Sequence, residues 1–212
     1  MKRWRILLAD DHDVVIAGLR LILTRPEFEI VGVVKDGRAL VQAAAELKPD
    51  IIIADVTMPL QSGIEAAEQI RRKNRRVKIV FLTMHPDVTY AAEALAAGGT
   101  GYVLKSSAGE ELPDAVHKAL KGQVHLPKSM EAAVRLALQN RAAGQRANDK
   151  LTRRQQEVLQ FIAEGRSVKE IGAALGVSPR TVEFHKYRMM EQLGARTAAE
   201  LVRYAIKRGI VT

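Results

Sequence analysis

The sequence has no cysteine, few aromatic residues and no long apolar run. Without Cys, the 212-residue chain has no disulfide, no zinc–thiolate site and no thiol chemistry. No apolar run approaches the ~20 residues that a membrane span requires. Only four apolar residues separate the basic start from Asp10 and Asp11, which is too few for a signal peptide. These absences predict a cytoplasmic protein with no membrane partner.

What the chain has in excess is positive charge, with a net charge of +9. Residues 1–128 carry 18 Lys/Arg against 16 Asp/Glu, a net of +2. Residues 151–212 carry 11 against 6, a net of +5 in a much shorter segment. This density favours a polyanion partner for the C-terminal part, although a solvated basic surface would have the same composition.

Five short aliphatic runs predict five β-strands. The runs span residues 6–9, 30–34, 51–54, 79–82 and 101–104. They do not alternate apolar with polar residues, so both faces of each strand are expected to be buried, as in a parallel sheet. Ala- and Leu-rich segments of helical length follow at about 13–24, 37–48, 63–73, 87–97 and 109–121. This alternation predicts a doubly wound α/β domain, in which chemistry collects at the carboxyl ends of the strands.

The strand signal stops at about residue 128, and only helices are predicted beyond it. A helical stretch over 129–143 and a polar run over 144–150 form a connection. Four further helices have clear limits, marked by the capping boxes Thr152/Gln155, Ser167/Glu170 and Thr197/Glu200, the pair Ser178-Pro179, and the closing residues Gly165, Gly176 and Gly194. We therefore predict a first domain over 1–124, a linker with a helix over 125–149, and a small all-α domain over 150–212.

Charged and polar residues stand where the predicted strands end. Asp10 and Asp11 follow the first strand, Asp55 the third, Thr83 the fourth and Lys105 the fifth. In a parallel sheet all five lie at one edge, where three carboxylates repel one another unless a cation bridges them. Hard oxygen ligands suit Mg²⁺, which leaves one carboxylate free to attack a phosphoryl group while Lys105 and Thr83 bind its oxygens. Any one of these residues alone is better explained as a helix cap or a loop solubiliser, but the five together on these strands favour the phosphoryl site.

The segments around these residues resemble the receiver domain of bacterial two-component response regulators. The resemblance covers about residues 4–122 and rests on the segments 8–12, 50–59, 82–83 and 101–105. It implies that Asp55 is the phosphoacceptor and that Lys105 pairs with the aspartyl phosphate. It also implies that Mg²⁺ is held by Asp10, Asp11, Asp55 and the Val56-Thr57 backbone.

The same resemblance implies a switch pair, Thr83 and Tyr102. The threonine hydroxyl would be drawn toward the phosphate and the tyrosine ring would turn inward to fill the vacated space, although an aromatic strand residue is otherwise ordinary core. Thr57 and His85 stand at variable positions that tune how long the phosphate survives. The loop 60–63, Leu-Gln-Ser-Gly, departs from the family, which more often has Gly and then Asn or Asp before the second Gly. We expect different loop dynamics here.

Residues 168–193 have the layout of a helix-turn-helix, with a support helix, a tight turn over 176–178 and a second helix over 179–193. At ~100° per residue, one side of the second helix carries Val182, Lys186, Met189 and Leu193. The opposite side carries Phe184, Tyr187, Arg188 and Glu191, with Glu183 beside them. Exposed aromatics next to an arginine suit a DNA groove. The predicted DNA contacts are Arg180, Thr181, Glu183, Phe184, Lys186, Tyr187 and Arg188. A helical interaction domain without a DNA role is the alternative.

This segment is similar to the LuxR-type helix-turn-helix over residues 151–209. The similarity is carried by the segments 151–159, 163–165, 169–171 and 181–186. His185 is common at its place in that family, which implies a mostly structural role. Glu191-Gln192 departs from the family, which usually has basic residues that touch phosphate there, and Val168 stands where Asn is frequent. We therefore expect weaker non-specific DNA binding.

The last predicted helix, 197–207, carries more apolar residues than one stripe requires: Leu201, Val202, Tyr204, Ala205 and Ile206. A leftover apolar face on a small domain usually marks a partner site. We expect it to form a homodimer contact that places two second helices on half-sites roughly one helical turn apart. Packing inside its own domain is the alternative.

Together the resemblances are to NarL/LuxR-type response regulators and span essentially the whole chain. They imply a transcription regulator rather than an enzyme. A sensor histidine kinase would phosphorylate it on Asp55, and it would then bind promoter DNA as a homodimer. RNA polymerase is a further candidate partner. A constitutive regulator whose receiver only dimerises is disfavoured by the intact Asp55, Thr83 and Lys105. A metal-dependent phosphohydrolase is disfavoured because Thr57 stands where such enzymes place a second acid.

Overall fold

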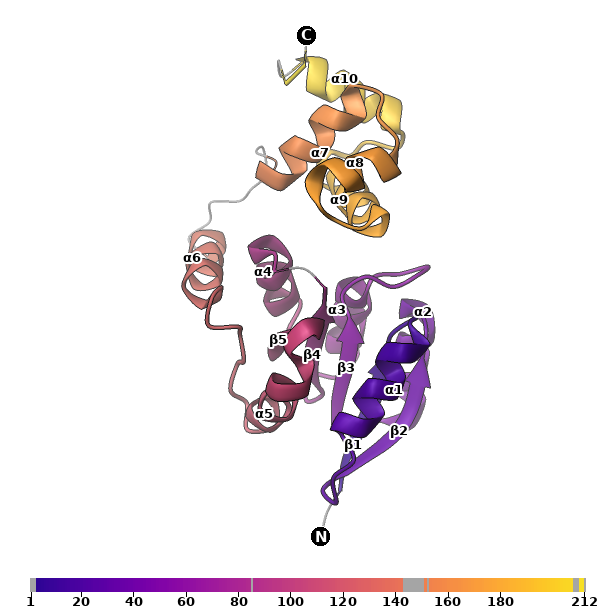
Figure 1. Cartoon of the computed structure of the whole chain (residues 1–212), viewed down its shortest axis with the longest axis vertical. Helices are drawn as coiled ribbons and strands as arrows, with labels where there is room; N and C mark the ends of the chain where they lie inside the picture. The colour runs from indigo at the N-terminus through magenta and orange to yellow at the C-terminus, as the bar shows by residue number, and fades with distance from the viewer. Residues whose placement is uncertain (1–2, 85, 143–150, 152, 208–209, 212) are drawn as a thin grey trace. The chain divides into compact units, whose positions relative to one another are not determined.

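The computed structural model describes residues 3–84, 86–142, 151, 153–207 and 210–211. The chain divides into two compact units, Met1–Gln139 and Asn140–Thr212, the first α/β and the second helical (Figure 1). This confirms the predicted fold class. None of the helices in the described ranges combines the length and the apolar character needed to cross a bilayer.

The first unit alternates strands with helices, as the sequence predicts. Its elements are β1 (Trp4–Ala9), α1 (Asp13–Ile22), β2 (Phe28–Val34), α2 (Gly37–Leu47), β3 (Ile51–Asp55), α3 (Gly63–Lys73), β4 (Lys78–Thr83), α4 (Val88–Ala96), β5 (Gly101–Leu104), a 3₁₀ turn (Lys105–Ser107), α5 (Ala108–Leu120) and α6 (Glu131–Ala142). All strands are parallel, in the order β2-β1-β3-β4-β5. The order reverses between β1 and β3, the point where doubly wound sheets place their sites.

Strand register sets which side chains meet at the carboxyl edge. Ala9 pairs with Ala54, so the residues that follow, Asp10 and Asp55, leave the sheet side by side. Thr83 pairs with Leu104, which places Lys105 one residue beyond the end of β5. The five residues that the sequence places at strand ends therefore share one edge.

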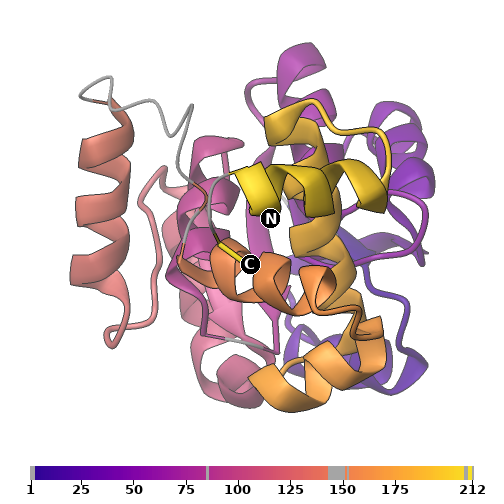
Figure 2. The same ribbon diagram turned by 90° about the horizontal axis from the view of Figure 1, so that it is seen from above.

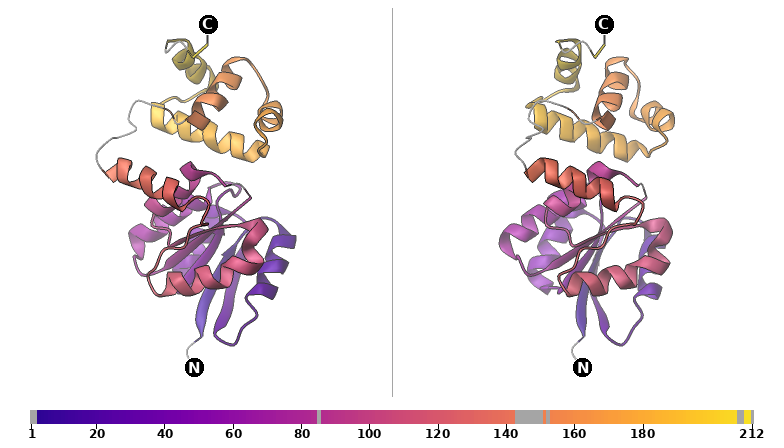
Figure 3. Two further views of the ribbon diagram at one scale, coloured as in Figure 1. Left: turned by 60° about the vertical axis from the view of Figure 1, so that its left-hand side comes forward. Right: turned by 90° about the vertical axis from the view of Figure 1, so that its left-hand side faces the viewer.

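The sheet is buried on both faces, with helices on either side (Figure 3). On one face, the core joins β1, β3, β4 and β5 to Ile16 and Leu19 of α1 and to Leu112 and Val116 of α5. Helices α2, α3 and α4 contribute further buried residues, such as Leu40. Because both faces are covered, the strands carry continuous aliphatic runs.

The second unit is a four-helix domain within the described residues (Figure 2). Its helices are α7 (Arg153–Ala163), α8 (Val168–Leu175), α9 (Pro179–Leu193) and α10 (Ala198–Lys207). Its core is formed by Leu151, which precedes α7, and by buried residues of all four helices: Val158, Leu159, Ile171, Val182, Met189, Leu201 and Ala205.

The predicted helix limits are confirmed in most cases. The Ser167/Glu170 capping box forms in both directions, and Ser178 caps α9, whose first residue is Pro179. Gly165, Gly176 and Gly194 have positive φ angles at helix ends. The prediction of a full Thr197/Glu200 box is wrong in one half: Thr197 Oγ1 accepts from the Glu200 N–H, but the Glu200 carboxylate accepts from the N–H of Arg196, at 2.6 Å. Thr152 and the run 144–150 lie outside the described residues.

The loop after β3 has one position that requires Gly and one at which a leucine has a strained backbone. Gly63 lies so close to the chain that a Cβ would come within 2.0 Å of the Asp55 carbonyl oxygen, so only Gly fits there. Leu60 adopts a left-handed backbone with φ of 64°, and its side chain is 73% exposed. This position is one at which the sequence departs from the receiver pattern. Leu60 therefore pays a conformational cost without gaining buried contacts.

Replacing Leu60 with Gly is expected to raise the free energy of unfolding by about 1 kcal/mol. A left-handed backbone costs a residue with a Cβ roughly 1–2 kcal/mol, which Gly avoids. The larger conformational entropy that Gly loses on folding offsets only part of this stabilisation. Urea unfolding measures the change. Leu60→Ala is the matched control, since it keeps the strain and removes only an exposed side chain. Equal stability of the two variants would contradict the strain at Leu60.

Candidate functional site

The centre of the carboxyl edge is a lysine shared by two buried carboxylates. The Lys105 ammonium lies 2.6 Å from Asp10 Oδ2 and 2.7 Å from Asp55 Oδ2. Asp10 is fully buried, Asp55 is 3% exposed and the Lys105 side chain 7%. Buried charges are tolerated only when they are paired and hydrogen-bonded. The three side chains come from the ends of β1, β3 and β5, so the sheet itself fixes their geometry.

The other carboxylate oxygens are held by backbone N–H groups. His12 N–H donates to Asp10 Oδ1 at 2.9 Å, and Thr57 N–H donates to Asp55 Oδ1 at 3.1 Å. The Nδ1 atom of His12 lies 3.1 Å from an oxygen of Asp10 and of Asp11. Sequence reasoning gave His12 no role, and its only signal was its place directly after the Asp pair.

The donor set fits a divalent cation. One ligand atom from each of Asp10, Asp11, His12 and Asp55 lies within 4.8 Å of the others. Carboxylate oxygens are the ligands that hard cations take, in numbers that leave room for water. The pocket at this edge is thus acidic and suited to a divalent metal.

Electrostatics in the pocket separate the roles of Asp55 and Lys105. Burial raises the pKa of Asp55 above its ordinary value, and the nearby Lys105 offsets this only in part. Burial alone would lower the pKa of Lys105, but Asp55 and Asp10 outweigh it and raise that pKa. The lysine therefore stays cationic, while the Asp55 carboxylate is destabilised and gains from a further positive charge.

The predicted switch residues are in contact. Thr83 is 5% exposed and Tyr102 is fully buried, and their side chains share a hydrogen bond. Burial raises the pKa of the Tyr102 hydroxyl, and the bond with Thr83 opposes this rise. The tyrosine ring thus already lies inward in this structure. His85 lies outside the described residues.

The second candidate surface is the outer face of α9. Val182 and Met189 are fully buried and His185 is 2% exposed, so the inner side of the helix is placed as predicted. Glu183 and Tyr187 are exposed, the latter by 59%, and Arg180, Phe184 and Lys186 are half-buried. The Lys186 ammonium lies 5.1 Å from the centre of the Tyr187 ring.

Two members of the predicted contact set are engaged within the helix. Thr181 is 3% exposed, and its hydroxyl oxygen lies 2.8 Å from that of Ser178. The side chain of Thr181 supports the helix start instead of facing outward, which corrects its place in the set. The Arg188 side chain is 20% exposed, and its guanidinium pairs with Glu191 at 2.8 Å.

Helix α10 uses much of its apolar surface inside its own unit. Leu201 and Ala205 are fully buried, and Tyr204 packs against the same core. Val202 is half-buried and Ile206 is 56% exposed. Of the five apolar residues predicted to form a partner face, these last two remain most available.

Comparison with known proteins matches both units. Residues 6–117 match the model of the response regulator receiver domain, and residues 149–205 match that of bacterial regulatory proteins of the luxR family. The chain is 35% identical over 208 residues to the transcriptional regulatory protein LiaR of Bacillus subtilis, covering 98% of this chain and 99% of the relative. It is 36% identical over 216 residues to the oxygen regulatory protein NreC of Staphylococcus carnosus, covering 98% and 99%.

Solved structures agree with these relatives. The RcsB response regulator of Salmonella typhimurium matches with a TM-score of 0.57 and 29% identity, over 96% of this chain and 98% of that one. A structure of an RcsB–DNA complex matches over the whole of both chains, with a TM-score of 0.58 and 29% identity. The chain therefore belongs to the LuxR-type DNA-binding response regulators, in which a receiver domain precedes a LuxR-type helix-turn-helix domain.

Proposed function

We propose that this regulator is switched by phosphorylation of Asp55 by a sensor histidine kinase and then binds promoter DNA in the cytoplasm to control transcription. The observation that carries the proposal is the Lys105 ammonium held between the Asp10 and Asp55 carboxylates at the switch point of the sheet. In this proposal the receiver spans 1–124, the linker 125–149 and the DNA-binding domain 150–212.

The proposed metal is Mg²⁺, held by Asp10, Asp11, Asp55 and the Thr57 backbone. When bound, it neutralises charge on the carboxylates and on the incoming phosphoryl oxygens. An Asp55 carboxylate oxygen attacks phosphorus, a P–O bond forms, and the bond from phosphorus to the donor's leaving atom breaks. Lys105 then pairs with a phosphoryl oxygen in place of the lost carboxylate charge, and Thr83 donates its hydroxyl to another.

The position two residues after the nucleophile, where aspartyl phosphohydrolases carry their acid–base residue, is Thr57, which cannot take that role. We infer that the aspartyl phosphate is a long-lived signal and that the protein is not a phosphohydrolase of small esters. A regulatory role needs this persistence, since the charge must last long enough to shift the Thr83–Tyr102 pair.

For the second unit we propose DNA binding through the outer face of α9. Arg180, Lys186 and Arg188 supply phosphate contacts, while Glu183, Phe184 and Tyr187 face base edges. Pairing of Arg188 with Glu191 weakens one of these phosphate contacts. A solved relative is titled as two RcsB dimers on two parallel DNAs, and we propose that this chain also binds as a homodimer. RNA polymerase is then the expected partner at a promoter.

Asp55 is expected to gain one phosphoryl group from acetyl phosphate, and only when Mg²⁺ or Mn²⁺ is present. Intact-mass measurement follows the gain. Asp55→Asn removes the nucleophile and Lys105→Ala removes the counter-charge, so both are expected to abolish stable labelling. Asp13→Asn is the matched control, because Asp13 is near in sequence but 80% exposed at its side chain. Full, stable labelling of Asp55→Asn would contradict the assignment.

Lys186→Ala is expected to weaken binding to all DNA sequences alike and to reduce the slope of log K against log salt by about 0.9, the loss of one phosphate contact. Tyr187→Ala is expected to alter which sequences are preferred. Salt titrations on specific and random duplexes measure both effects. A Lys186→Ala protein with an unchanged salt slope and a new sequence preference would contradict the assignment of Lys186 to a phosphate contact.

Val202→Asp is expected to abolish cooperative binding to DNA with two half-sites, because it places a carboxylate in the apolar face left on α10. Binding isotherms on one- and two-half-site duplexes give the cooperativity, and circular dichroism verifies that the variant is folded. Gln160→Asp places the same charge at an exposed position of α7 and serves as the control. Unchanged cooperativity in folded Val202→Asp would rule out α10 as the dimer contact.

A further inference from the structure

The segment that follows α5 is attached to the outer edge of the sheet. β5 is the last strand in the order, so one of its edges would otherwise lack a partner. The Tyr102 N–H donates to the His125 carbonyl at 2.9 Å, and the His125 N–H donates to the Thr100 carbonyl at 3.1 Å. A parallel bridge between Gly101 and His125 results. The backbone bond to Tyr102 matters because this residue also contacts Thr83.

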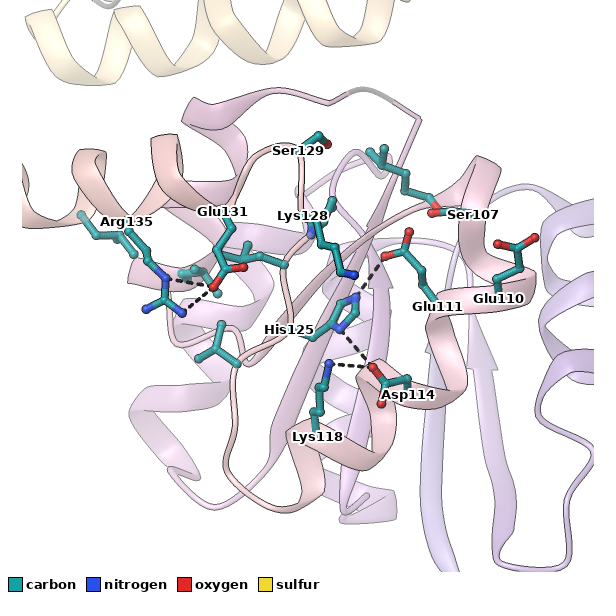
Figure 4. Close-up of a pocket in the computed structure, with 16 residues that line it drawn as sticks. Ser107, Glu110, Glu111, Asp114, Lys118, His125, Lys128, Ser129, Glu131 and Arg135 are labelled. Atoms are coloured by element: carbon teal, nitrogen blue, oxygen red, sulfur yellow. Dashed lines mark hydrogen bonds and ion pairs between the residues drawn. The ribbon is translucent and has the colours of Figure 1, made fainter.

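The side chain of His125 fixes this attachment to α5 (Figure 4). The residue is 8% exposed, with Nε2 lying 3.1 Å from Glu111 Oε2 and Nδ1 3.7 Å from Asp114 Oδ2. Lys118 lies 2.7 Å from the same Asp114 oxygen. Hydrogen bonding to Lys118 is the main reason why the pKa of Asp114 lies below its ordinary value, so this carboxylate stays charged opposite the imidazole. His125 therefore bridges two turns of α5.

The same segment leads directly into α6. Met130, 4% exposed, begins the turn that Val134, fully buried, continues. Between α6 and the body of the unit lies a cavity of about 700 Å³. Its wall includes Leu95 of α4, Leu104 of β5 and Arg135 of α6, and Figure 4 shows His125 and Glu111 facing into it. Helix α6 is therefore held to the unit by the buried Val134 and by the 124–130 segment, with this space beside it.

We propose that His125 is a positioning residue that couples β5 to α6. The segment 124–126 acts as a latch: it is bonded to the backbone of Tyr102 on one side and is pinned to Glu111 and Asp114 on the other. The Tyr102 ring already lies inward, so the movement that acts on the segment 124–126 is a shift of the Tyr102 backbone, which carries the bond to His125. The segment in turn sets the position of α6, the helix that precedes the DNA-binding unit in the chain. The inference rests on the proposed function, since it takes Tyr102 as the residue that responds to phosphorylation.

The first test measures the strength of the backbone bond between Tyr102 and His125 in the unphosphorylated protein. Exchange of the Tyr102 amide with solvent, followed by NMR, reports directly on its bond to His125, because the edge of β5 is otherwise open. His125→Ala is expected to speed this exchange about fivefold, the factor that corresponds to about 1 kcal/mol. His117→Ala is the matched control, because His117 is a histidine of α5 whose side chain is 41% exposed. Unchanged Tyr102 exchange in His125→Ala would overturn the latch.

The second test reads the coupling in the full chain. Phosphorylation is expected to raise affinity for a two-half-site duplex by about 5- to 150-fold, the usual range for coupled sites. In His125→Ala, the logarithm of this increase in affinity is expected to be at most half of the wild-type value. Mass measurement verifies that Asp55 is still labelled in the variant. A full gain in labelled His125→Ala would overturn the coupling, whereas a wild-type chain that is never labelled contradicts the proposed function instead. Should His125→Ala fail to fold, the double variant Glu111→Gln with Asp114→Asn removes the same pins and has the same two readouts.

Discussion

The Lys105 ammonium between two buried carboxylates is the constraint on which the rest of the receiver depends. Asp10 and Asp55 would repel each other strongly at this depth, and Lys105 cancels only one of their charges. With Asp11 beside them, the pocket keeps a net negative charge that a divalent cation would offset. The edge of a parallel sheet supplies this geometry at little cost, because the strand register already places the three side chains together.

Placing the charge at the sheet edge also decides how a signal leaves the site. In the proposed mechanism, a phosphoryl group on Asp55 would bring further negative charge to a pocket whose lysine is already shared, so neighbouring donors would move toward it. Thr83 is a hydroxyl donor at the end of β4, and it is already bonded to Tyr102. From Tyr102 the backbone leads to His125, and from His125 the chain leads to α6. Each step is a contact between neighbours.

Sequence patterns predicted the sheet, the helix limits and the five strand-end residues, because burial on both faces and capping leave strong local signals. Two features had no such signal, and a third had only a weak one. Thr181 turns inward because its hydroxyl meets Ser178, which a helical wheel does not reveal. Leu60 adopts a left-handed backbone, and its signal was that the receiver family more often has Gly in this loop. His125 pairs with a strand more than 20 residues earlier, and a contact at that separation leaves no periodic pattern.

The central proposal is that phosphorylation of Asp55 in the receiver changes which DNA the second unit binds. The most direct test is to sequence the genomic DNA that the full chain retains, with and without a phosphoryl donor. The wild-type chain is expected to retain a defined set of promoter fragments far more strongly with the donor, and Asp55→Asn is expected to retain the same fragments equally weakly in both conditions. Identical retention by wild-type protein in both conditions, with labelling of Asp55 verified by mass, would contradict the account.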